Sequence, residues 1–371
     1  MRVLLLSDVN STHTQKWAVS LKNAGVVSGL FSITEPKVPW CQDHGIPLFL
    51  SRWQQWNTLL PAVFTKTLYL MRLPSLRRAI KDFRPDIIHA HYASSYGFLG
   101  ALSGFHPFVL SVWGTDIFDF PNISFVHKMI IKFNLSKADK ILSTSNVMVR
   151  ETEKYTNKEI EVTPFGVDLA HFKLRTVDSI FDNDAVVIGT VKTLEPKYGI
   201  RDLLKAFKIV KENNQNLPVK LLVVGGGPEE KVLKKLAKDL SIHDDTVFTG
   251  SISSIGVSEY YNMISIFVAL SIKESFGVAI VEAQATEKPV VVSNSGGLPE
   301  VVEDGVTGIV VESKNPDAAA KAIEYLVHNR ALGEKMGKLG RKRVKQIYDW
   351  KNNVEQMVDI YNRILRSLSK V

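Results

Sequence analysis

The sequence has almost no cysteine and no long apolar run. Cys41 is the only cysteine among 371 residues, which excludes an internal disulfide and any zinc site built on two or more thiolates. No stretch approaches the roughly 20 apolar residues that cross a bilayer, and the apolar run at residues 3–6 is too short for the core of a signal peptide. We therefore expect a chain without transmembrane segments that works in a reducing compartment, the cytoplasm.

Metal-binding patterns are scarce as well. The nine histidines include no pair spaced for metal binding on one helix. His89 and His91 flank one residue at the end of an expected strand, and we expect them to line a site rather than to bind a metal. No motif supports a pyridoxal lysine, so the sequence predicts neither a metal nor a cofactor.

The length and charge of the chain limit the class of protein. A chain of 371 residues exceeds what one hydrophobic core usually serves, so we expect two domains. The net charge of +8 would favour nucleic acid, anionic lipid or phosphorylated substrates. The basic residues are spread over both halves without a recognition motif for nucleic acid, which argues against nucleic acid as a partner.

Short β-branched runs alternate with longer helical patterns along the chain. This alternation is typical of βαβ units around a parallel sheet. We expect strands at residues 3–6, 87–89, 108–112 and 140–144 in the first half, and at residues 185–189, 220–224, 246–248, 266–270 and 289–293 in the second. The predicted fold class is α/β, with two doubly wound, Rossmann-like domains that face each other across a cleft.

A segment without clear periodicity separates the two halves. It spans residues 169–184 and contains acidic and polar residues, so we assign it as the linker. The first domain then covers residues 1–168 and the second covers residues 185–341. Residues 342–371 are basic and carry apolar side chains at helical spacing, which predicts a closing C-terminal helix that packs across the domains.

The segment from Glu274 to Glu282 places two carboxylates around the start of an expected helix. Ser275 is the expected N-cap, and the small Gly277 lets a ligand approach the free amides of the first turn, which favour an anion such as a phosphate. Carboxylates near a phosphate are unfavourable unless they accept from hydroxyl groups. We therefore expect the two glutamates to bind sugar and ribose hydroxyls.

Two lysines, Lys192 and Lys197, lie five residues apart in the turn after the strand that opens the second half. Taken alone, they are typical of a solvated surface pair. Together with the helix start described above, they predict two ammonium groups directed at one point. There they would offset the charge that develops on a departing diphosphate.

These motifs resemble those of the retaining glycosyltransferases of family 4, which have the GT-B fold. The pair of Glu274 and Glu282 is similar to the paired-glutamate signature of that family. Lys192 and Lys197 are similar to its diphosphate-binding basic pair, the first member of which is more often arginine. The turn at residues 164–168 also looks like a family feature, as does the turn at residues 297–300, which suits a structural and a site-lining role equally. The resemblance covers nearly the whole chain.

The resemblance implies that the chain is a metal-independent hexosyltransferase. Its donor would be a nucleotide diphosphate sugar, with a UDP-sugar favoured, and the leaving diphosphate would help to deprotonate the acceptor while the configuration at the anomeric carbon is retained. The acceptor would be a glycan or a lipid-linked molecule in the assembly of cell-surface polysaccharide or lipopolysaccharide. A nucleotide-sugar epimerase with the same fold is the alternative. Asp182 and Asp184 superficially match the carboxylate pair of metal-dependent glycosyltransferases, but we expect them to lie in a solvated loop.

Particular residues can be assigned to these roles. The catalytic residues we expect are Lys192, Lys197 and Glu274. The residues expected to bind the donor are Ser275, Phe276, Gly277, Val278, Glu282, Gly225, Gly226, Gly250 and Ser251. The glycine run at residues 225–227 permits close approach of the backbone to a ligand, but it lacks the spacing of a dinucleotide-binding fingerprint.

The sequence departs from the family pattern at two places. Ser11-Thr12-His13-Thr14 stands where many relatives carry a glycine pair, and Trp113 stands where many carry a histidine. We expect Trp113 to line the sugar or acceptor pocket by stacking or through its indole N–H. His13, His91 and Asp116 are the residues expected to supply polar contacts there.

Aromatic, aliphatic and basic residues are mixed between residues 53 and 84 of the first domain. Tryptophan and tyrosine favour the depth of lipid headgroups, and the basic side chains favour anionic lipid. An anionic membrane surface is therefore a candidate partner, and the protein would then be peripheral on the inner face of the plasma membrane. An ordinary core helix with a charged outer face explains the same residues.

Overall fold

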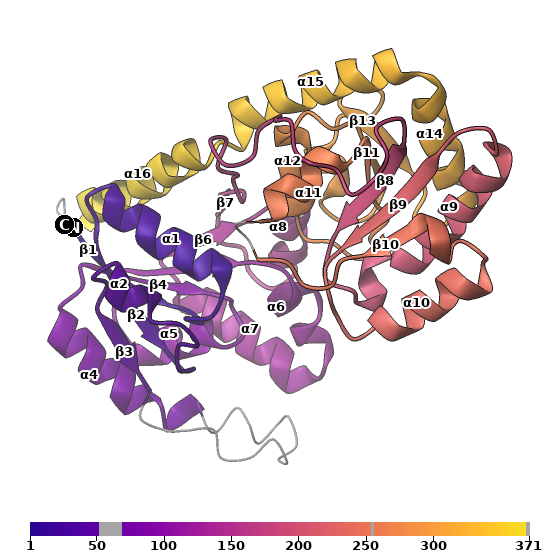
Figure 1. The fold of residues 1–371 in the computed structure, drawn as a ribbon. Helices are drawn as coiled ribbons and strands as arrows, with labels where there is room; N and C mark the ends of the chain where they lie inside the picture. Colours follow the sequence, from indigo (N-terminus) through magenta and orange to yellow (C-terminus); the bar gives the residue numbers. More distant parts are fainter. Residues whose placement is uncertain (52–68, 254–255, 369–371) are drawn as a thin grey trace. The chain divides into compact units, whose positions relative to one another are not determined.

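The chain folds into two compact units. The computed structural model describes residues 1–51, 69–253 and 256–368 (Figure 1). The first unit combines Met1–Pro164 with Asn353–Val371, and the second unit is Phe165–Asn352. The chain therefore passes between the units twice, after Pro164 and after Asn352, whereas the sequence predicts boundaries at residues 168 and 341. The segment 169–184, expected as a linker, belongs to the second unit.

A parallel sheet of seven strands forms the centre of the first unit. Its strand order is β3-β2-β1-β4-β5-β6-β7, and every pairing is parallel. The strands are β1 (Arg2–Leu6), β2 (Val27–Ser32), β3 (Leu48–Leu50), β4 (Ile87–His91), β5 (Phe108–Val112), β6 (Lys140–Ser143) and β7 (Ile160–Val162). The helices are α1 (Thr12–Asn23), α2 (Trp40–Asp43), α4 (Leu73–Phe83), α5 (Tyr96–Ser103), α6 (Thr115–Phe118), α7 (Phe125–Lys137) and α8 (Asn146–Glu153), with the 3-10 helix η1 (Phe120–Asn122).

A parallel sheet of six strands forms the centre of the second unit. Its order is β10-β9-β8-β11-β12-β13. The strands are β8 (Val186–Val191), β9 (Val219–Val224), β10 (Thr246–Phe248), β11 (Ile266–Ala269), β12 (Val290–Ser293) and β13 (Gly308–Val311). The helices are α9 (Ile200–Asn213), α10 (Glu230–Asp239), α11 (Val257–Met263), α12 (Val278–Ala285), α13 (Leu298–Val301), α14 (Pro316–His328) and α15 (Arg330–Ile347), with the 3-10 helices η2 (Pro196–Tyr198) and η3 (His243–Asp245).

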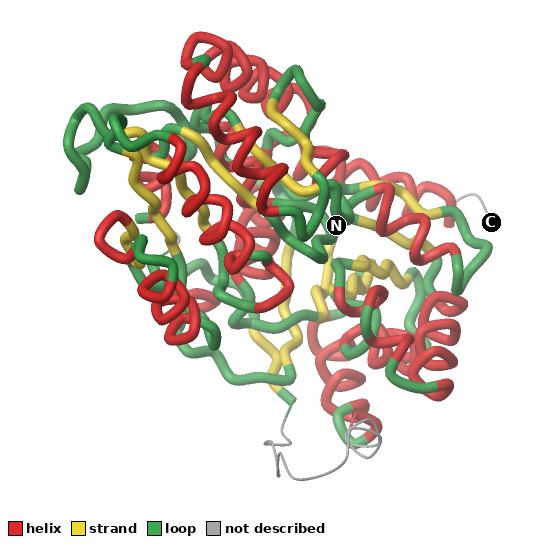
Figure 2. The backbone as a smooth tube through the Cα atoms, turned by 90° about the vertical axis from the view of Figure 1, so that its right-hand side faces the viewer, coloured by secondary structure: helices red, strands yellow, loops and turns green. Residues whose placement is uncertain are grey.

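The central strands are apolar because both faces of each sheet are covered by helices, which Figure 2 shows in red around the yellow strands. In β1, Val3 and the three leucines after it are fully buried. The apolar residues in the middle of β9 and the three valines of β12 are also fully buried, and the last residue of β12 is a fully buried serine. Each unit has its own hydrophobic core. The predicted fold class, two doubly wound α/β sheets, is confirmed.

Each sheet has a point where the strand order reverses. In the first unit the chain runs outward from β1 to β3 and returns to β4 beside β1, and in the second it runs outward from β8 to β10 and returns to β11 beside β8. Loops that leave the carboxyl ends of such neighbouring strands diverge to opposite faces of the sheet, which leaves a crevice where ligands bind. The two pairs β1/β4 and β8/β11 therefore indicate where functional residues should lie.

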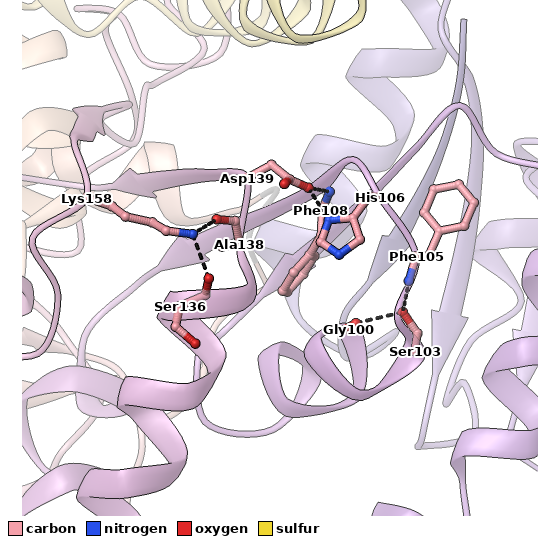
Figure 3. Close-up of polar contacts among 9 residues, drawn as sticks. All are labelled: Gly100, Ser103, Phe105, His106, Phe108, Ser136, Ala138, Asp139 and Lys158. Atoms are coloured by element: carbon pink, nitrogen blue, oxygen red, sulfur yellow. Dashed lines mark hydrogen bonds and ion pairs between the residues drawn. The ribbon is translucent and has the colours of Figure 1, made fainter. Parts of the chain in front are cut away.

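Polar contacts close the opposite, amino-terminal edge of the first sheet (Figure 3). Asp139, just before β6, contacts His106 Nδ1 at 2.7 Å and accepts from the backbone N–H of Phe108 at 2.6 Å. Lys158, just before β7, donates to two carbonyl oxygens at the end of α7, at 2.7 and 2.5 Å. These contacts satisfy backbone groups that the start of β5 and the end of α7 leave without a partner.

The C-terminal region contains two helices where the sequence predicts one. α15 ends at Ile347, and α16 (Trp350–Leu368) begins after a break at Tyr348 and Asp349. The break is fixed because Val167 bridges it: its N–H donates to the Tyr348 carbonyl at 2.8 Å, and its carbonyl accepts from the Trp350 N–H at 3.0 Å. From Asn353 onward, α16 belongs to the first unit.

Two observations bear on membranes. In the part of the chain that the structure describes, no helix has both the length and the apolar character needed to cross a bilayer. The aromatic stretch at residues 53–68, on which the expectation of membrane docking partly rests, lies outside the described residues.

Candidate functional site

Lys192 and Glu274 meet at the reversal point of the second sheet. Lys192 directly follows β8 and Glu274 lies in the loop after β11. The Lys192 ammonium contacts Glu274 Oε2 at 2.5 Å, and both side chains are largely buried. Ser271 Oγ donates to the same carboxylate oxygen at 3.3 Å. A charge pair this far from bulk water is stable only when each charge has a partner, so the two side chains hold each other in place.

Tyr198 brings the second lysine to this pair. The ring of Tyr198 lies 4.3 Å from the Lys192 nitrogen and 4.9 Å from the Lys197 nitrogen, so both ammonium groups make cation–π contacts with one ring. Lys197 also pairs with Glu195 Oε2 at 2.8 Å. Although burial lowers the pKa of Lys197, its contacts with Glu195 and Tyr198 outweigh burial and raise that pKa above its ordinary value. Lys197 therefore carries full positive charge at neutral pH.

The loop that carries Glu274 is tied to the loop that carries the lysines. The carbonyl oxygen of Lys197 accepts from the N–H of Ile272 at 2.8 Å and from that of Lys273 at 3.3 Å. The carbonyl oxygen of Glu274 in turn accepts from the N–H of Gly297 at 3.1 Å. Backbone hydrogen bonds thus connect the loops after β8, β11 and β12, and the Gly297 N–H holds the backbone of Glu274 in place.

The loops after β9 and β10 contact each other. They carry Gly225, Gly226, Gly250 and Ser251, four of the residues expected to bind the donor. The N–H of Gly225 donates to the carbonyl of Gly250 at 3.1 Å. A side chain at Gly226 would press against Ser251 Oγ. Gly225 has a φ of +131°, and a Cβ atom there would collide with the Lys192 carbonyl. This backbone conformation and close approach both require glycine.

The start of α12 differs from the sequence prediction. Gly277, with a φ of +108°, is the N-cap residue, and it provides no side-chain cap. Ser275 lies two residues earlier and does not cap the helix, because the chain needs a left-handed residue to enter α12 at that angle. Phe276 is buried among Phe165 and Tyr348, with ring centroids 6.0 and 5.5 Å away. Its side chain therefore anchors the loop, and Val278 begins the helix.

Glu282 occupies the middle of α12, and its position is set by a buried tyrosine. Tyr261 is fully buried, and its hydroxyl donates to Glu282 Oε2 at 2.7 Å. Burial, and then the negative charge of Glu282, raise the pKa of Tyr261 well above its ordinary value. The tyrosine is thus a permanent donor that orients the carboxylate. Glu274 is not part of α12, so the two glutamates are placed by a loop and a helix respectively.

Three of the residues expected to line a sugar or acceptor pocket, His13, His91 and Trp113, gather at the reversal point of the first sheet. His91 ends β4, and its ring lies 4.5 Å from the Trp113 ring at a tilt of 31°. The His13 ring meets Trp113 edge-on at 5.9 Å. His91 Nδ1 lies 3.3 Å from Ser7 Oγ, which follows β1 and shares a 2.6 Å hydrogen bond with Thr14 Oγ1. A cavity of 430 Å³ opens here, lined in part by Ser7, His13, His91 and Trp113.

The histidines of this region are held neutral. Burial, and then Lys16, lower the pKa of His13 to about 4. Burial, together with the neighbouring His89 and His13, lowers the pKa of His91 well below its ordinary value. Burial also lowers the pKa of His89 to about 3, and the ring of His89 is fixed between Tyr361 at 2.6 Å and Ser111 at 2.8 Å. His89 is therefore a structural residue, whereas His13 and His91 offer neutral hydrogen-bonding groups to the cavity.

Asp116 is placed differently from the sequence prediction. Its side chain is fully buried, and its carboxylate accepts from the backbone N–H groups of Ala93 at 2.7 Å, Gly114 at 2.7 Å and Trp113 at 3.2 Å. Burial raises the pKa of Asp116, although these backbone hydrogen bonds act in the opposite direction. Asp116 thus positions the Trp113 loop on the end of β4 instead of supplying a polar contact to the cavity.

Sequence reasoning missed three residues of these sites. Tyr198 contacts Lys192 and Lys197, Tyr261 holds Glu282, and Ser7 supports His91. The one available signal was position: Tyr198 follows Lys197 directly, and Ser7 follows β1 at the edge where ligands bind. No sequence pattern pointed to Tyr261, which comes from α11, 21 residues before its partner.

The candidate sites offer no metal centre in the described ranges. No group of three or more histidine, cysteine, aspartate or glutamate side chains is arranged to hold an ion among residues 1–51, 69–253 and 256–368. Asp182 and Asp184, the pair weighed as metal ligands, are exposed in the segment before β8.

Comparisons with known proteins agree with this architecture. A family model described as "Glycosyl transferases group 1" matches residues 175–343, and one described as "Glycosyl transferase 4-like" matches residues 2–145. The capsular polysaccharide biosynthesis glycosyltransferase CapM of Staphylococcus aureus is 32% identical over 279 residues, which cover 72% of this chain and 68% of that protein. The chain belongs to glycosyltransferase family 4 and has the GT-B fold.

Solved structures share the fold at low sequence identity. Sucrose-phosphate synthase from Thermosynechococcus elongatus superposes with a TM-score of 0.85 at 19% identity, over 99% of this chain and all of that one. HepE from Anabaena, solved in complex with UDP and glucose, superposes with a TM-score of 0.79 at 17% identity, over 98% of this chain and all of that one. These structures show the fold, and the family models together with the CapM relative show that the protein is a glycosyltransferase.

Proposed function

We propose that this glycosyltransferase moves a hexosyl group from a UDP-sugar to a glycan or lipid-linked acceptor, without a metal and with retention at the anomeric carbon. The observation that carries the proposal is the cluster of Lys192, Glu274, Lys197 and Tyr198 at the reversal point of the second sheet. It joins the ammonium groups of two lysines to one carboxylate that can accept from hydroxyl groups.

The lysines are proposed to bind the diphosphate of the donor. In the free protein Lys192 is neutralised by Glu274 and Lys197 by Glu195. An incoming diphosphate supplies a second anionic partner for each ammonium group, and its negative charge grows as the bond to the sugar breaks. Ammonium groups held in position by Tyr198 stabilise that growing charge without first having to reorganise.

The two glutamates are proposed to bind hydroxyl groups at the two ends of the donor. Glu282, oriented by Tyr261, accepts from the ribose hydroxyls. Glu274 accepts from a hydroxyl of the transferred sugar, and it moves from Lys192 toward the sugar when the diphosphate takes over that ammonium group. Ser275, Gly277 and the glycine loops around Gly225 and Gly250 surround the rest of the nucleotide with backbone groups.

The transfer step is proposed as in other members of family 4. The bond between the anomeric carbon and the diphosphate oxygen breaks, and its electron pair stays on the diphosphate. The acceptor oxygen forms its bond to the same face of the anomeric carbon, and the acceptor proton goes to the departing diphosphate. The two lysines supply the positive charge that a metal supplies in other glycosyltransferases, which is why we propose metal independence.

The acceptor is proposed to enter the first unit. The neutral His13 and His91 and the ring of Trp113 suit the hydroxyls and apolar faces of a sugar, because they bind by hydrogen bonding and stacking without a fixed charge. We further propose a role in cell-surface polysaccharide or lipopolysaccharide assembly, at the cytoplasmic face of the membrane. CapM, the relative described above, is named for capsular polysaccharide biosynthesis.

The experiment begins with the purified protein and a thermal-shift screen against UDP, GDP and ADP and their sugars. A ligand that binds only the folded state raises the melting temperature, and at equal concentration the tighter ligand raises it more. We expect UDP to give the largest shift among the diphosphates, because HepE, which shares the fold, was solved with UDP. The anomeric configuration of the product, measured by NMR, should equal that of the donor, and activity should survive excess chelator.

Three results would contradict the proposal. A larger shift with GDP would change the donor, an inverted product would exclude retention, and activity restored only by manganese or magnesium would show that a metal is needed. An epimerase would convert the donor without any acceptor, so incubation with donor alone separates that alternative.

A further inference from the structure

The outward face of α7, in the first unit, is apolar over its first two turns. The helix turns His127, Ile131 and Leu135 inward, where they are buried. On the opposite side Phe125 is 77% exposed and Met129 is 47% exposed. The outward face of a surface helix is usually charged or polar, so this face departs from the pattern that solvent exposure favours.

These side chains form one patch. Phe125 and Met129 are four residues apart and therefore neighbours on the helix surface. Val126, 53% exposed, adjoins them, and Ile123, 59% exposed, lies two residues before the helix. We call these four residues the α7 patch. Other helices of the described chain expose large apolar side chains singly, as α10 does with Val232, and single exposures need no explanation.

The charged residues of α7 itself have one sign, and the nearest exposed acidic residue before the helix is Asp119. Lys128 and Lys132 are exposed, and their positions on the helical wheel are beside Phe125 on the flank away from Val126. α7 contains three lysines and neither aspartate nor glutamate. An apolar centre with lysines along one flank fits a surface that is apolar inside and anionic outside, because the lysine stems can lie along the apolar region while the ammonium groups reach the anions.

α4, on the same face of the sheet but separated from α7 by α5, has the same character. α5 contacts both α4 and α7, and right-handed crossovers to β4, β5 and β6 place all three helices on one face of the first sheet (Figure 1). Just before α4, Leu70 and Met71 are exposed. α4 itself exposes Arg77, Arg78 and Lys81 against a single acidic residue, Asp82.

We propose that the α7 patch docks on the surface of an anionic lipid bilayer, with Phe125 and Met129 inserted at the boundary between headgroups and acyl chains and with Lys128 and Lys132 at the phosphates. The proposal rests on the proposed use of a lipid-linked acceptor, and it assigns the membrane contact to α7. A surface helix with an apolar face and a lysine-rich polar face binds membranes in this way.

The test measures sedimentation of the full-length protein with vesicles of phosphatidylcholine alone and of phosphatidylcholine with phosphatidylglycerol. The wild type should bind the anionic vesicles, and binding should weaken at high salt because the lysine contribution is screened. Phe125→Asp combined with Met129→Gln should lower the partition coefficient by at least about tenfold, since two inserted side chains are lost. Aspartate at the first position of α7 is compatible with the helix dipole, so the variant should remain folded.

α10 provides matched controls. It exposes Val232 between Lys231 and Lys235, but it also carries Glu230 and Asp239. Val232→Asp should leave binding to anionic vesicles within about twofold of the wild type. Lys128→Gln with Lys132→Gln should weaken binding to anionic vesicles, by up to about thirtyfold if each lysine contributes as a basic residue close to an anionic surface does. Lys231→Gln with Lys235→Gln should have a clearly smaller effect.

The possible outcomes decide between a membrane and another partner. No sedimentation of the wild type with anionic vesicles, or equal loss in the α7 and α10 variants, would overturn the proposal. So would a wild-type dimer in light scattering that Phe125→Asp converts to a monomer, because the patch would then bind a second copy. Binding of UDP in vesicle-free solution, measured by calorimetry, tests the proposed function separately. It should be unchanged in the α7 variants, and its absence in the wild type would contradict the proposed function while leaving the vesicle result intact.

Discussion

The two reversal points of this protein use the same backbone arrangement and opposite side-chain chemistry. At β8/β11 the side chains are ionic, with Lys192 on Glu274 and Lys197 on Glu195. At β1/β4 they are neutral and aromatic, with His91 against Trp113 and two histidines whose pKa values lie below neutrality. In a doubly wound sheet the strand order fixes where a ligand binds, and the loop residues then decide which kind of ligand.

The difference in side-chain chemistry suggests that the two sites bind different substrates. A diphosphate leaving group gains negative charge during transfer, so it needs fixed positive charge that does not have to be assembled. An acceptor hydroxyl and a sugar ring are neutral, and a permanent charge next to them would remain costly to bury. The ionic and neutral sites therefore match the donor and acceptor halves of one transfer reaction.

We expect the largest loss of turnover from substitution of the two lysines of the ionic site. Lys192→Ala and Lys197→Ala should each lower turnover by about 10² or more, since each removes positive charge that acts on the leaving diphosphate. Steady-state kinetics with the identified donor measures the loss. Lys234→Ala is the control, because Lys234 makes an exposed pair with Glu230 in α10 of the same unit. Unchanged rates in both site variants would remove the ionic half of the comparison.

Substitution of the two glutamates should impair different properties, UDP binding for Glu282 and turnover for Glu274. Glu282→Ala should weaken binding of bare UDP by about tenfold, because a charged acceptor of hydrogen bonds is lost. Glu274→Ala should leave that binding unchanged or tighter, since Lys192 loses its internal partner, and should lower turnover with the full donor. Titration calorimetry and kinetics measure the two effects.

The glutamate variants have their own controls. Glu282→Gln keeps an oxygen that can accept from Tyr261, so it separates a folding defect from a lost ribose contact. If Glu274→Ala abolished UDP binding in a folded protein while Glu282→Ala left it intact, the nucleotide would lie the other way around on the second unit.

The smallest effect concerns stability against pH, and it should be confined to the first unit. His89 and His91 have lower pKa values folded than unfolded, so below about pH 6.5 the unfolded chain binds protons that the folded unit does not. Above that pH these histidines do not lower the free energy of unfolding. As the pH falls toward their pKa values in the folded state, the free energy of unfolding decreases by up to about 1.4 kcal/mol per pH unit for each histidine.

Urea unfolding at pH 7 and pH 5 measures this loss. Tryptophan fluorescence suits the first unit, because five of the six tryptophans precede residue 114. His89→Gln should reduce the pH dependence, and the exposed His243→Gln should not. An equal pH dependence in wild type and His89→Gln would show that these buried histidines do not distinguish the first unit.

The sequence predicts most strands at the centres of the sheets, because buried parallel strands consist of continuous runs of apolar, often β-branched, residues. It misses β2, whose residues include two serines and a glycine, and the three-residue strands β3 and β7. It also misses β13 at a sheet edge and the break between α15 and α16. These elements are fixed by pairing with distant segments, as Val167 does at the break, and local patterns do not record such pairing.

The candidate site is predictable to the extent that residues are charged and close to a strand end. Lys192 and Glu274 are 82 residues apart in sequence, and the sheet order brings them together. The support of Glu282 by Tyr261, the burial of Phe276 and the burial of Asp116 could not be predicted, because the sequence shows that a side chain is polar or aromatic but not which way the loop turns it.

The most direct test of the division between the two reversal points is the dissociation constant of UDP, measured by calorimetry for the wild type, Lys197→Ala and Trp113→Ala. We predict that Lys197→Ala raises it at least about tenfold, since a charge-assisted contact is lost, and that Trp113→Ala leaves it unchanged while raising KM for the acceptor. An increase with Trp113→Ala and none with Lys197→Ala would contradict the account, because the diphosphate would then bind at the neutral site of the first unit.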